Sequence, residues 1–451
     1  DVYKRQAAKA ETPKITTKKV QPIKVETTKT EPVKVETKKT EPIKVETKKV
    51  APAKVETQKA EAVKVETAKV ESAKVETKKT ETAKVETTKS EPVKLENKRD
   101  DDHIYCERLA RHLDELKWLY CELYQDNPYV TMHLNDLLKV LKKFYDMRND
   151  ALKESDLNRE KDPTWYKRND LTGMMMYVNA FAGTLSNLES KLDYIQECNV
   201  NYLHLMPLLE SPEGKSDGGY AVSDFRKVQP ELGTMEDLES LADECRKKGI
   251  SLCMDFVMNH TSEEHEWAKR ARAGEREYMD RYYFYDNYDV PSQFEQTVPQ
   301  VFPTTAPGNF TWLDDMKKFV MTTFYPYQWD LNYWNPVVMN EMVYNMLNLT
   351  NKGIDVIRID AVPYIWKQLG TNCRNLPQVH NIVRMMRMIC EIVCPGVLLL
   401  GEVVMEPEKV VPYFGSVEKP ECHMLYNVTT MATTWNTVAT RDARLLRQQM
   451  D

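Results

Sequence analysis

The sequence predicts an α/β fold, a (β/α)8 TIM barrel of which about six of the eight units are present. After about residue 171, short β-branched runs alternate with helical stretches, a pattern typical of right-handed βαβ units around a parallel sheet. Polar residues follow the end of one strand after another, as they do where a barrel builds its site. Five clear strands and one weaker strand would also fit a doubly wound sheet, but the polar strand ends favour the barrel.

The first hundred residues differ from this pattern. A ten-residue repeat of the Lys-Val-Glu-Thr type runs from about residue 14 to 99 and is interrupted by prolines such as Pro22 and Pro32. Each repeat carries too little apolar surface to build a packed layer, so residues 1–101 are predicted to be a disordered tail that serves as a spacer or a tether. Residues 102–170 carry leucines at helical spacing and predict a small N-terminal helical domain.

Residues 171–451 are predicted to be the partial barrel, the catalytic domain. Strands are expected at 174–181, 202–206, 251–256, 356–359, 397–400 and, weakly, 424–426. Helices are expected at 103–125, through 134–144, and at 185–198, 234–248, 336–351, 377–394, 407–413 and from about 430. Thr234 begins one of these helices as an N-cap followed by acidic residues. Residues at about 261–332, with many Pro, Asn, Tyr and Trp, interrupt the alternation and are predicted to be an insertion.

Composition excludes several classes of protein. The formal net charge of −6 gives no reason to expect nucleic acid as a partner. The sequence has no apolar run of transmembrane length and no signal-peptide pattern. Its nine cysteines are scattered without disulfide or metal-ligand spacing. A cytoplasmic location is therefore expected, with secretion left open because the sequence begins at Asp1 rather than at a methionine. The oligomeric state is not predicted.

Residues 353–362 join a helix end to a buried strand and a carboxylate. Gly353 can close the preceding helix by adopting a positive φ. Arg358 and Asp360 lie two residues apart, so their side chains point to the same side of a strand. A fixed cation beside the carboxylate should keep Asp360 ionised and ready to act as a nucleophile. A buried structural ion pair is the alternative interpretation of the same residues.

Other predicted strands also end in polar residues. These residues are Asp217 and Tyr220, then Asp255, Asn259 and His260, and then Glu402. Asp255 alone could be a turn former, His260 a core histidine and Glu402 a helix N-cap. Together with Asp360, however, Glu402 supplies the pair of carboxylates that glycosidic bond chemistry requires, about 5–5.5 Å apart in a retaining enzyme. One attacks the anomeric carbon, and the other protonates the leaving oxygen and then activates the acceptor. His260 and Tyr220 would hold the sugar.

At these residues the sequence resembles the α-amylase family, glycoside hydrolase family 13. The first signature of the family is matched by residues 255–260, the second by 353–361 and the third by 401–403. A narrower resemblance, to the amylosucrases of that family, covers about residues 102–450. It rests on residues 213–222, 259–267, 302–303, 328–333, 365–371 and 435–441.

The resemblance implies roles for the candidate residues. Asp360 would be the nucleophile, Glu402 the general acid/base, Arg358 the partner of the nucleophile, His260 a contact of the glucosyl ring, Tyr220 a stacking platform, and Asp217 the floor of the pocket, paired with an arginine. Asp255 and Asn259 would support the site. The insertion would be domain B. No organic cofactor is implied, and Asn259 alone does not establish a calcium site, so no metal is expected.

The implied reaction is cleavage of sucrose with retention and transfer of the glucosyl unit to an α-1,4-glucan or to water. Sucrose and α-glucan would be the partners. An α-amylase, an α-glucosidase, or a sucrose hydrolase or phosphorylase of the same family is the alternative, and an inactive glucan-binding protein is an alternative of another class. The fourth signature of the family, a His-Asp pair, would follow residues 435–441 and is not reached. The sequence is therefore expected to be a fragment, inactive as given, of an active protein.

Overall fold

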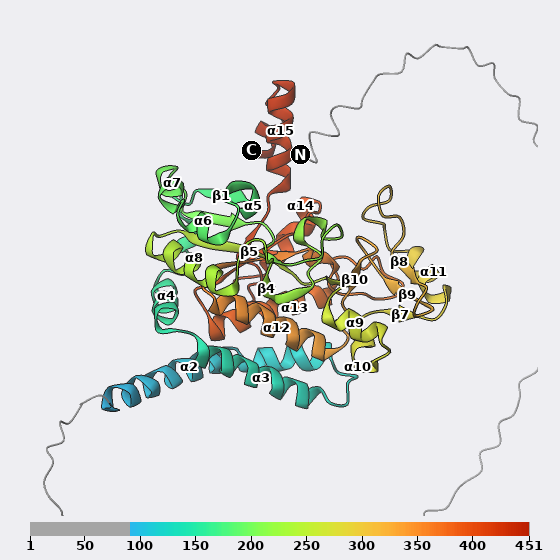
Figure 1. Ribbon diagram of the computed structural model, residues 1–451, viewed down its shortest axis with the longest axis horizontal. Helices are drawn as coiled ribbons and strands as arrows, with labels where there is room; N and C mark the ends of the chain where they lie inside the picture. The colour runs from blue at the N-terminus through green and yellow to red at the C-terminus, as the bar shows by residue number, and fades with distance from the viewer. Residues whose placement is uncertain (1–90, 451) are drawn as a thin grey trace, which may run out of the picture. The chain divides into compact units, whose positions relative to one another are not determined.

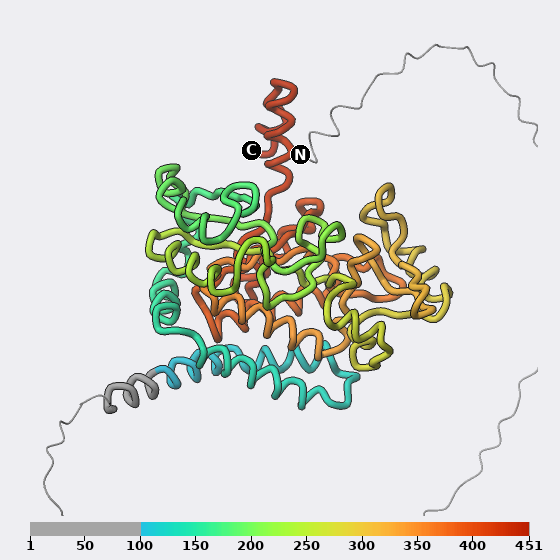
Figure 2. The backbone as a smooth tube through the Cα atoms, in the orientation of Figure 1, coloured from blue at the N-terminus to red at the C-terminus, as the bar shows by residue number. Residues whose placement is uncertain are grey.

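A computed structural model describes residues 91–450, with side chains from residue 101 onward (Figures 1 and 2). The repeat tail and its predicted disorder lie outside the described residues, apart from its last few positions. Those positions belong to helix α2 (Glu91–Leu123), which begins before residue 102, where the helical domain was predicted to start.

Six parallel strands form the central sheet. They are β1 (Gly173–Met176), β2 (Tyr202–Leu205), β5 (Ser251–Val257), β11 (Val356–Asp360), β12 (Leu398–Gly401) and β13 (Met424–Leu425). Their order across the sheet is their order in the chain. A doubly wound sheet would reverse direction at a switch point. The sequential order instead matches a sheet curled into a half-barrel, so the prediction of an incomplete (β/α)8 barrel is confirmed.

Helices between the strands cover the outer face of the sheet. Among them, α8 (Met235–Lys247), α12 (Pro336–Asn351) and α13 (Pro377–Val393) lie close to their predicted bounds. The Thr234 hydroxyl and the Asp237 carboxylate form a capping box at the start of α8, as the N-cap pattern predicts. Between these helices and the strands lies the main hydrophobic core of the molecule.

Two predicted elements near the first strand are wrong in extent. The strand expected to reach residue 181 ends at Met176, where its pairing with β2 ends, and the helix α5 (Val178–Phe181) follows. The helix expected over 185–198 is two short helices, α6 (Leu185–Glu189) and α7 (Leu192–Glu197). The Ser190 hydroxyl donates back to the Asn187 carbonyl, a local bond that competes with helix propagation.

Three helices at the start of the described chain pack against the helices of the barrel. They are α2, α3 (Val130–Met147) and α4 (Asp150–Lys161), and they run along the lower edge and left side of the view in Figures 1 and 2. Helix α2 contacts α13, and α3 contacts α12. Helix α4 was not predicted because it has few apolar residues; its side-chain cap is Asn149. The boundary near residue 170 stays a prediction.

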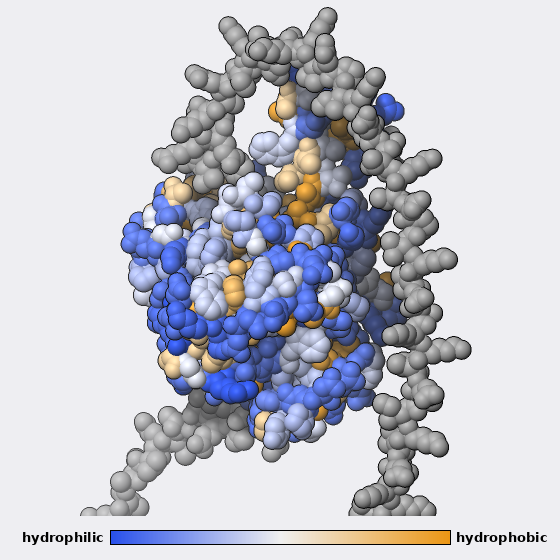
Figure 3. Space-filling model, turned by 90° about the vertical axis from the view of Figure 1, so that its right-hand side faces the viewer, coloured by the Kyte–Doolittle hydropathy of each residue, from blue (hydrophilic) through white to orange (hydrophobic). Residues whose placement is uncertain are grey.

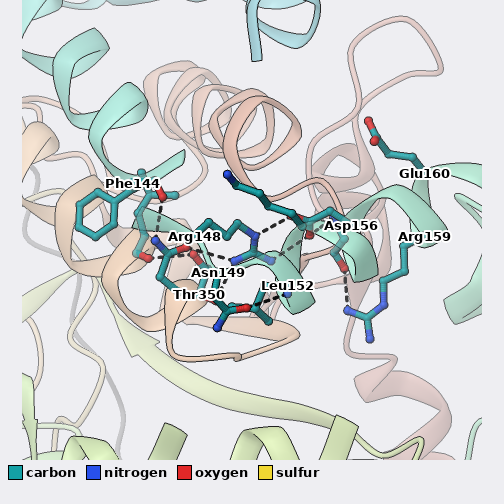
Figure 4. A network of polar contacts seen from close by, with 12 residues as sticks. Phe144, Arg148, Asn149, Leu152, Asp156, Arg159, Glu160 and Thr350 are labelled. Atoms are coloured by element: carbon teal, nitrogen blue, oxygen red, sulfur yellow. Dashed lines mark hydrogen bonds and ion pairs between the residues drawn. The ribbon is translucent and has the colours of Figure 1, made fainter. Parts of the chain in front are cut away.

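A buried polar network fastens this helical layer to the barrel (Figure 4). Arg148 contacts both oxygens of Asp156, Nε at 2.6 Å and Nη2 at 2.9 Å, and its Nη1 donates to the Thr350 carbonyl at the end of α12. Asp156 Oδ1 also accepts the Gly396 N–H, just before β12. The layer therefore meets the barrel at the ends where its strands begin, away from the strand ends that carry the candidate residues.

The predicted insertion is a separate group of short elements, seen at the right of Figure 1. A three-stranded sheet holds β7 (Phe284–Tyr285), β9 (Lys318–Met321) and β8 (Phe310–Leu313), and β6 (His260–Ser262) pairs with β10 (Gln328–Asp330). Its helices are α9 (Glu266–Arg272), α10 (Arg276–Met279) and α11 (Asp289–Glu295). A further short pair, β3 (Leu209–Glu210) and β4 (Asp224–Val228), follows β2.

The C-terminal segment projects from this body. After α14 (Pro407–Val410), helices α15 (Val428–Thr440) and α16 (Arg444–Met450) extend beyond the rest of the ribbon (Figure 1). In Figure 3 hydrophobic residues lie among hydrophilic ones on this segment, and Trp435 is 74% exposed. Among the described residues, no helix combines the length and the apolar character needed to cross a membrane. All nine cysteines are free thiols.

Candidate active site

The candidate residues gather on the inner face of the curled sheet, where its strands end. A small apolar floor of Cys253, Val356 and Leu398 lies deeper in the curl. Two residues further along their strands come Asp255 and Arg358, which are register partners across β5 and β11. Because side chains alternate along a strand, these charged groups follow the floor on the same face. The barrel interior therefore changes from apolar to charged toward the strand ends.

Arg358 lies at the centre of this charged layer. Its Nη1 contacts Asp255 Oδ1 at 2.7 Å and Asp360 Oδ1 at 2.6 Å, while its Nη2 contacts Glu402 Oε1 at 2.7 Å. The arginine and Asp360 are both buried. One guanidinium thus joins the ends of three adjacent strands, and the prediction that Arg358 and Asp360 lie on one side of β11 is confirmed.

A strained residue fixes the second carboxylate. Ala361, directly after Asp360, has φ +50°, the left-handed region that residues with a Cβ adopt rarely. In this conformation its N–H donates to Glu402 Oε2 at 2.9 Å. Asp360 and Glu402 therefore touch the two terminal nitrogens of one guanidinium, and Glu402 is also held from the backbone.

The electrostatics of Asp360 differ from the prediction. Burial, and then the neighbouring Glu402 carboxylate, raise the pKa of Asp360 well above its usual value, and Arg358 only partly opposes them. The direction of this shift is opposite to the one that Arg358 alone would give, so the local pair does not set the pKa of Asp360. Three carboxylates thus share one guanidinium, which offsets only part of the cost of burying Asp360 beside Glu402.

Asp217 lies in a tight turn after β2. Asp217, Gly218 and Gly219 all have positive φ, and a Cβ on Gly219 would come within 2.7 Å of the Pro207 side chain, so only glycine fits there. Asp217 Oδ2 accepts from Gln328 Nε2 at 3.1 Å, and burial raises the pKa of the aspartate. In the described part of the chain, its partner is thus an amide from the insertion rather than an arginine.

Tyr220 and His260 stand beside the charged layer. The Tyr220 hydroxyl lies 3.4 Å from Asp255 Oδ1, and its ring centroid is 5.5 Å from the Arg358 guanidinium carbon. His260 Nε2 lies 3.2 Å from the Tyr220 carbonyl oxygen. Burial, and then the Lys367 ammonium, lower the pKa of His260 to about 3. The imidazole is therefore neutral at physiological pH, and both of its nitrogens have partners in the protein, because Nδ1 lies 3.2 Å from Asn259 Nδ2.

Asn259 lies next to His260 and joins the insertion to the barrel. Its Oδ1 accepts from Lys367 Nζ at 2.7 Å, and its Nδ2 lies 3.2 Å from Asp330 Oδ1. The Lys367 ammonium also contacts Asp330 Oδ2 at 3.1 Å and the Tyr364 carbonyl. A protein cation thus occupies the centre of this oxygen cluster. Across residues 91–450, no group of three or more His, Cys, Asp or Glu side chains is arranged to hold a metal ion.

Comparison with protein families agrees with this geometry. A family model described as the α-amylase catalytic domain matches residues 141–450, well over half of the chain. The chain belongs to the α-amylase family. It is therefore related to enzymes that cleave or transfer glycosidic bonds in this family, glycoside hydrolase family 13.

Curated relatives of the chain come from several branches of the α-amylase family. The trehalose synthase/amylase of Mycobacterium tuberculosis is 36% identical over 280 residues, which are 60% of this chain and 45% of that protein. The glucosylglycerate phosphorylase of Spirochaeta thermophila is 33% identical over 252 residues, 54% of this chain and 39% of that protein. The chain thus spans less than half the length of these two relatives.

Solved structures of the family share the fold. The trehalose-6-phosphate hydrolase of Bacillus licheniformis superimposes with a TM-score of 0.53 and 26% identity, over 60% of this chain and 50% of that one. The trehalulose synthase of Pseudomonas mesoacidophila gives a TM-score of 0.51 and 26% identity, over 57% of this chain and 49% of that one. Both likenesses support the barrel assignment.

Sequence reasoning missed several residues of the site. Tyr177 directly follows β1, and its hydroxyl donates to the Gly218 carbonyl at 3.3 Å; the strand-end rule could have found it. His204 lies within β2, where a polar residue in an apolar strand was the available signal. Gln328 contacts Asp217, and Lys367 contacts Asn259 and Asp330. These partners are distant in the chain, so no local sequence pattern predicts the contacts. The roles of all the named site residues remain proposals.

Proposed function

We propose that the protein is a retaining α-glucosyl transferase that takes its glucosyl unit from sucrose and passes it to an α-1,4-glucan, with hydrolysis as a side reaction. One observation carries the proposal: Arg358 contacts both Asp360 and Glu402 at the ends of adjacent strands. Membership of the α-amylase family supports retention and glucosyl chemistry. The choice of sucrose and α-glucan rests on the stretches that resemble amylosucrases.

In the first step, Asp360 attacks the anomeric carbon of the donor. The bond from that carbon to the leaving oxygen breaks as Glu402 gives that oxygen its proton, so fructose leaves neutral. The product is a β-glucosyl ester on Asp360 and an ionised Glu402. Arg358, which touches both groups, would stabilise the negative charge as it moves from one carboxylate to the other. For this step Asp360 must be ionised and Glu402 must carry the proton when the donor is bound.

In the second step, Glu402 takes the proton of an acceptor hydroxyl, and the acceptor oxygen attacks the same carbon from the opposite side. The ester bond to Asp360 breaks, which restores both carboxyl groups and the original α configuration. Glucan, through its terminal 4-hydroxyl, or water can serve as the acceptor. Neutral His260 and the Tyr220 ring are proposed to hold the glucosyl unit, and Asp217 is proposed to line the end of its pocket.

Trehalose formation is a second candidate activity, because several relatives carry the printed name trehalose synthase. The two proposals share the first step and differ in the donor. Sucrose would give fructose and a glucosyl ester, whereas a glucose disaccharide such as maltose would be rearranged to trehalose. We expect the residues around the Asp217 turn and Gln328 to determine whether sucrose or a glucose disaccharide binds as the donor.

Incubation of the full-length protein with sucrose tests the first proposal. Release of fructose, together with insoluble glucan or longer maltooligosaccharides from an added primer, is the expected result. Maltose offered in parallel serves as the comparison, and Asp360→Asn is the matched inactive control. Conversion of maltose to trehalose without any use of sucrose would replace the first proposal with the second. No turnover of either sugar would contradict both.

A further inference from the structure

His204 is a buried imidazole that no step of the proposed reaction uses. It lies on β2 opposite Cys253 of β5, and it is 5% exposed. Its Nε2 is 3.0 Å from Asp255 Oδ2, two residues further along β5. The contact joins two side chains that both face the interior of the curled sheet, one layer below the catalytic carboxylates.

Asp255 is held by side chains alone. Oδ2 faces His204, while Oδ1 meets Arg358 Nη1 at 2.7 Å and the Tyr220 hydroxyl at 3.4 Å. Its contacts within the described part of the chain come from the His204, Arg358 and Tyr220 side chains. Because Asp255 is 3% exposed, water has little access to replace a lost partner. The orientation of the carboxylate therefore depends on these few contacts, and the shortest one apart from Arg358 comes from His204.

Arg358 in turn depends on Asp255. Its Nε is buried without a partner among the described residues, so the guanidinium is positioned through its terminal nitrogens. Those nitrogens contact Asp255, Asp360 and Glu402, and two of these three groups change charge during the proposed reaction. Asp255 is the one anionic anchor whose charge can stay constant through both steps.

We propose that His204 is a positioning residue of the active site. Its Nε2–H donates to Asp255, which turns the other carboxylate oxygen toward Arg358 and so fixes the guanidinium between the nucleophile and the acid/base. Since Asp255 is an acceptor, the imidazole proton resides on Nε2. This inference rests on the proposed retaining mechanism but not on the identity of the donor sugar.

Two substitutions separate the hydrogen bond from the packing. Gln and Met have nearly the same length and volume, and the Gln amide nitrogen can reach the place of Nε2, whereas Met offers no donor. We expect His204→Met to lower kcat by about 10–100-fold with little change in KM, because a displacement of about 1 Å at a reacting group costs about that much. We expect His204→Gln to stay within about threefold of wild type.

Kinetics of the full-length protein on sucrose and on α-D-glucosyl fluoride test this proposal. Fluoride leaves without protonation, so the fluoride substrate reports on Asp360 and Arg358 even if sucrose is not the donor. Loss of kcat in the Met variant on both donors, restored in the Gln variant, supports the role. Wild-type kcat in the Met variant, or equal losses in both variants, would overturn it.

A binding measurement keeps the test independent of turnover. Calorimetric titration with 1-deoxynojirimycin, a cationic glucose mimic, measures how well the carboxylates are arranged. Affinity should fall about tenfold in His204→Met and stay near wild type in His204→Gln, a difference of about 1.4 kcal/mol by the tenfold conversion. If wild type turns over glucosyl fluoride but not sucrose, the proposal that sucrose is the donor fails. The role of His204 is then still tested by comparing its two variants on glucosyl fluoride. Equal affinity in both variants and wild type would contradict the role.

Discussion

Strand β11 has a buried aspartate facing an arginine at each end, and the two pairs differ in their surroundings. At the start of the strand, Asp355 Oδ1 meets Arg159 Nη1 at 2.6 Å, and its Oδ2 accepts the Leu252 N–H at 2.8 Å. Arg159, labelled in Figure 4, also donates to the Gly396 carbonyl. Asp355 and Arg159 therefore form a one-to-one ion pair. Backbone groups satisfy the second oxygen of Asp355 and a further N–H of Arg159.

At the other end, Asp360 shares Arg358 with two more carboxylates, Asp255 and Glu402. Here three acids surround one cation, and the pKa of Asp360 is raised by burial and by Glu402. The comparison teaches that an Arg–Asp pair by itself does not distinguish structure from catalysis. The surroundings do distinguish the two ends, because backbone groups complete the Asp355 pair, whereas further carboxylates crowd Arg358 beside Asp360.

Removing the carboxylate at the catalytic end should have the largest effect. Asp360→Asn should lower kcat by on the order of 10⁴-fold or more, because the nucleophile is lost. Thermal stability near pH 7 should rise slightly, since one of three crowded acids is gone. Steady-state kinetics and a thermal melt measure both changes. If kcat of Asp360→Asn stays within tenfold of wild type, Asp360 is not the nucleophile.

Removing the Asp355 carboxylate at the other end of the strand should lower stability and leave kcat almost unchanged. Asp355→Asn should lower the free energy of unfolding by about 2–3 kcal/mol, the range for a lost hydrogen bond to a charged group. The value of kcat should change by less than about twofold, because the strand end at Asp360 is not touched. Urea unfolding and kinetics at low temperature check this. A loss of kcat without a loss of stability would break the comparison.

The pH dependence of stability should sharpen the contrast. A carboxyl group whose pKa is raised by folding favours the folded state below the unfolded pKa of about 3.9, and this contribution is lost as pH rises through the folded pKa. Wild type should therefore lose stability relative to Asp360→Asn as pH increases from about 4 toward neutrality. Melting temperatures of the two proteins across this range test the sign. If the melting temperature of Asp360→Asn instead falls relative to wild type as pH rises, Arg358 lowers the pKa of Asp360 more than burial and Glu402 raise it.

A conservative change at the structural end should have the smallest effect. Arg159→Lys keeps the charge near Asp355 but loses the fork that also reaches the Gly396 carbonyl. We expect a loss of about 1 kcal/mol in the free energy of unfolding, with kcat unchanged. Chemical denaturation beside Asp355→Asn gives the measurement. If Arg159→Lys loses more free energy of unfolding than Asp355→Asn, the stabilising contact of Arg159 is not Asp355 but another group in the network of Figure 4.

The strands of the central sheet and the candidate site residues at their ends were the most predictable parts of the molecule. Periodicity found all six strands, and Gly353 has the positive φ, +93°, that its place after a helix suggested. The position of Asp360 and Glu402 at strand ends followed from the alternation of strands and helices. Such features depend on local sequence, which is why a single chain reveals them.

Contacts between distant segments were not predictable in the same way. The meeting of Asp217 with Gln328 joins residues 111 positions apart, and that of Lys367 with Asn259 joins residues 108 apart. The pKa of Asp360 depends on burial and then on Glu402, which another strand supplies, so the local Arg358 pair predicted the wrong direction. Helix α4 was missed because its stability comes from contacts such as Arg148 with Asp156 rather than from an apolar face.

The central claim is that Asp360 accepts the glucosyl unit. Glu402→Gln incubated with α-D-glucosyl fluoride tests it most directly, because the ester can form without acid help but breaks down slowly without the base. Peptide mass spectrometry should then find a glucosyl group on the peptide that contains Asp360, and the label should be absent in a variant that also carries Asp360→Asn. A label on another carboxylate, or turnover of the fluoride with no covalent label at any time, would contradict the account.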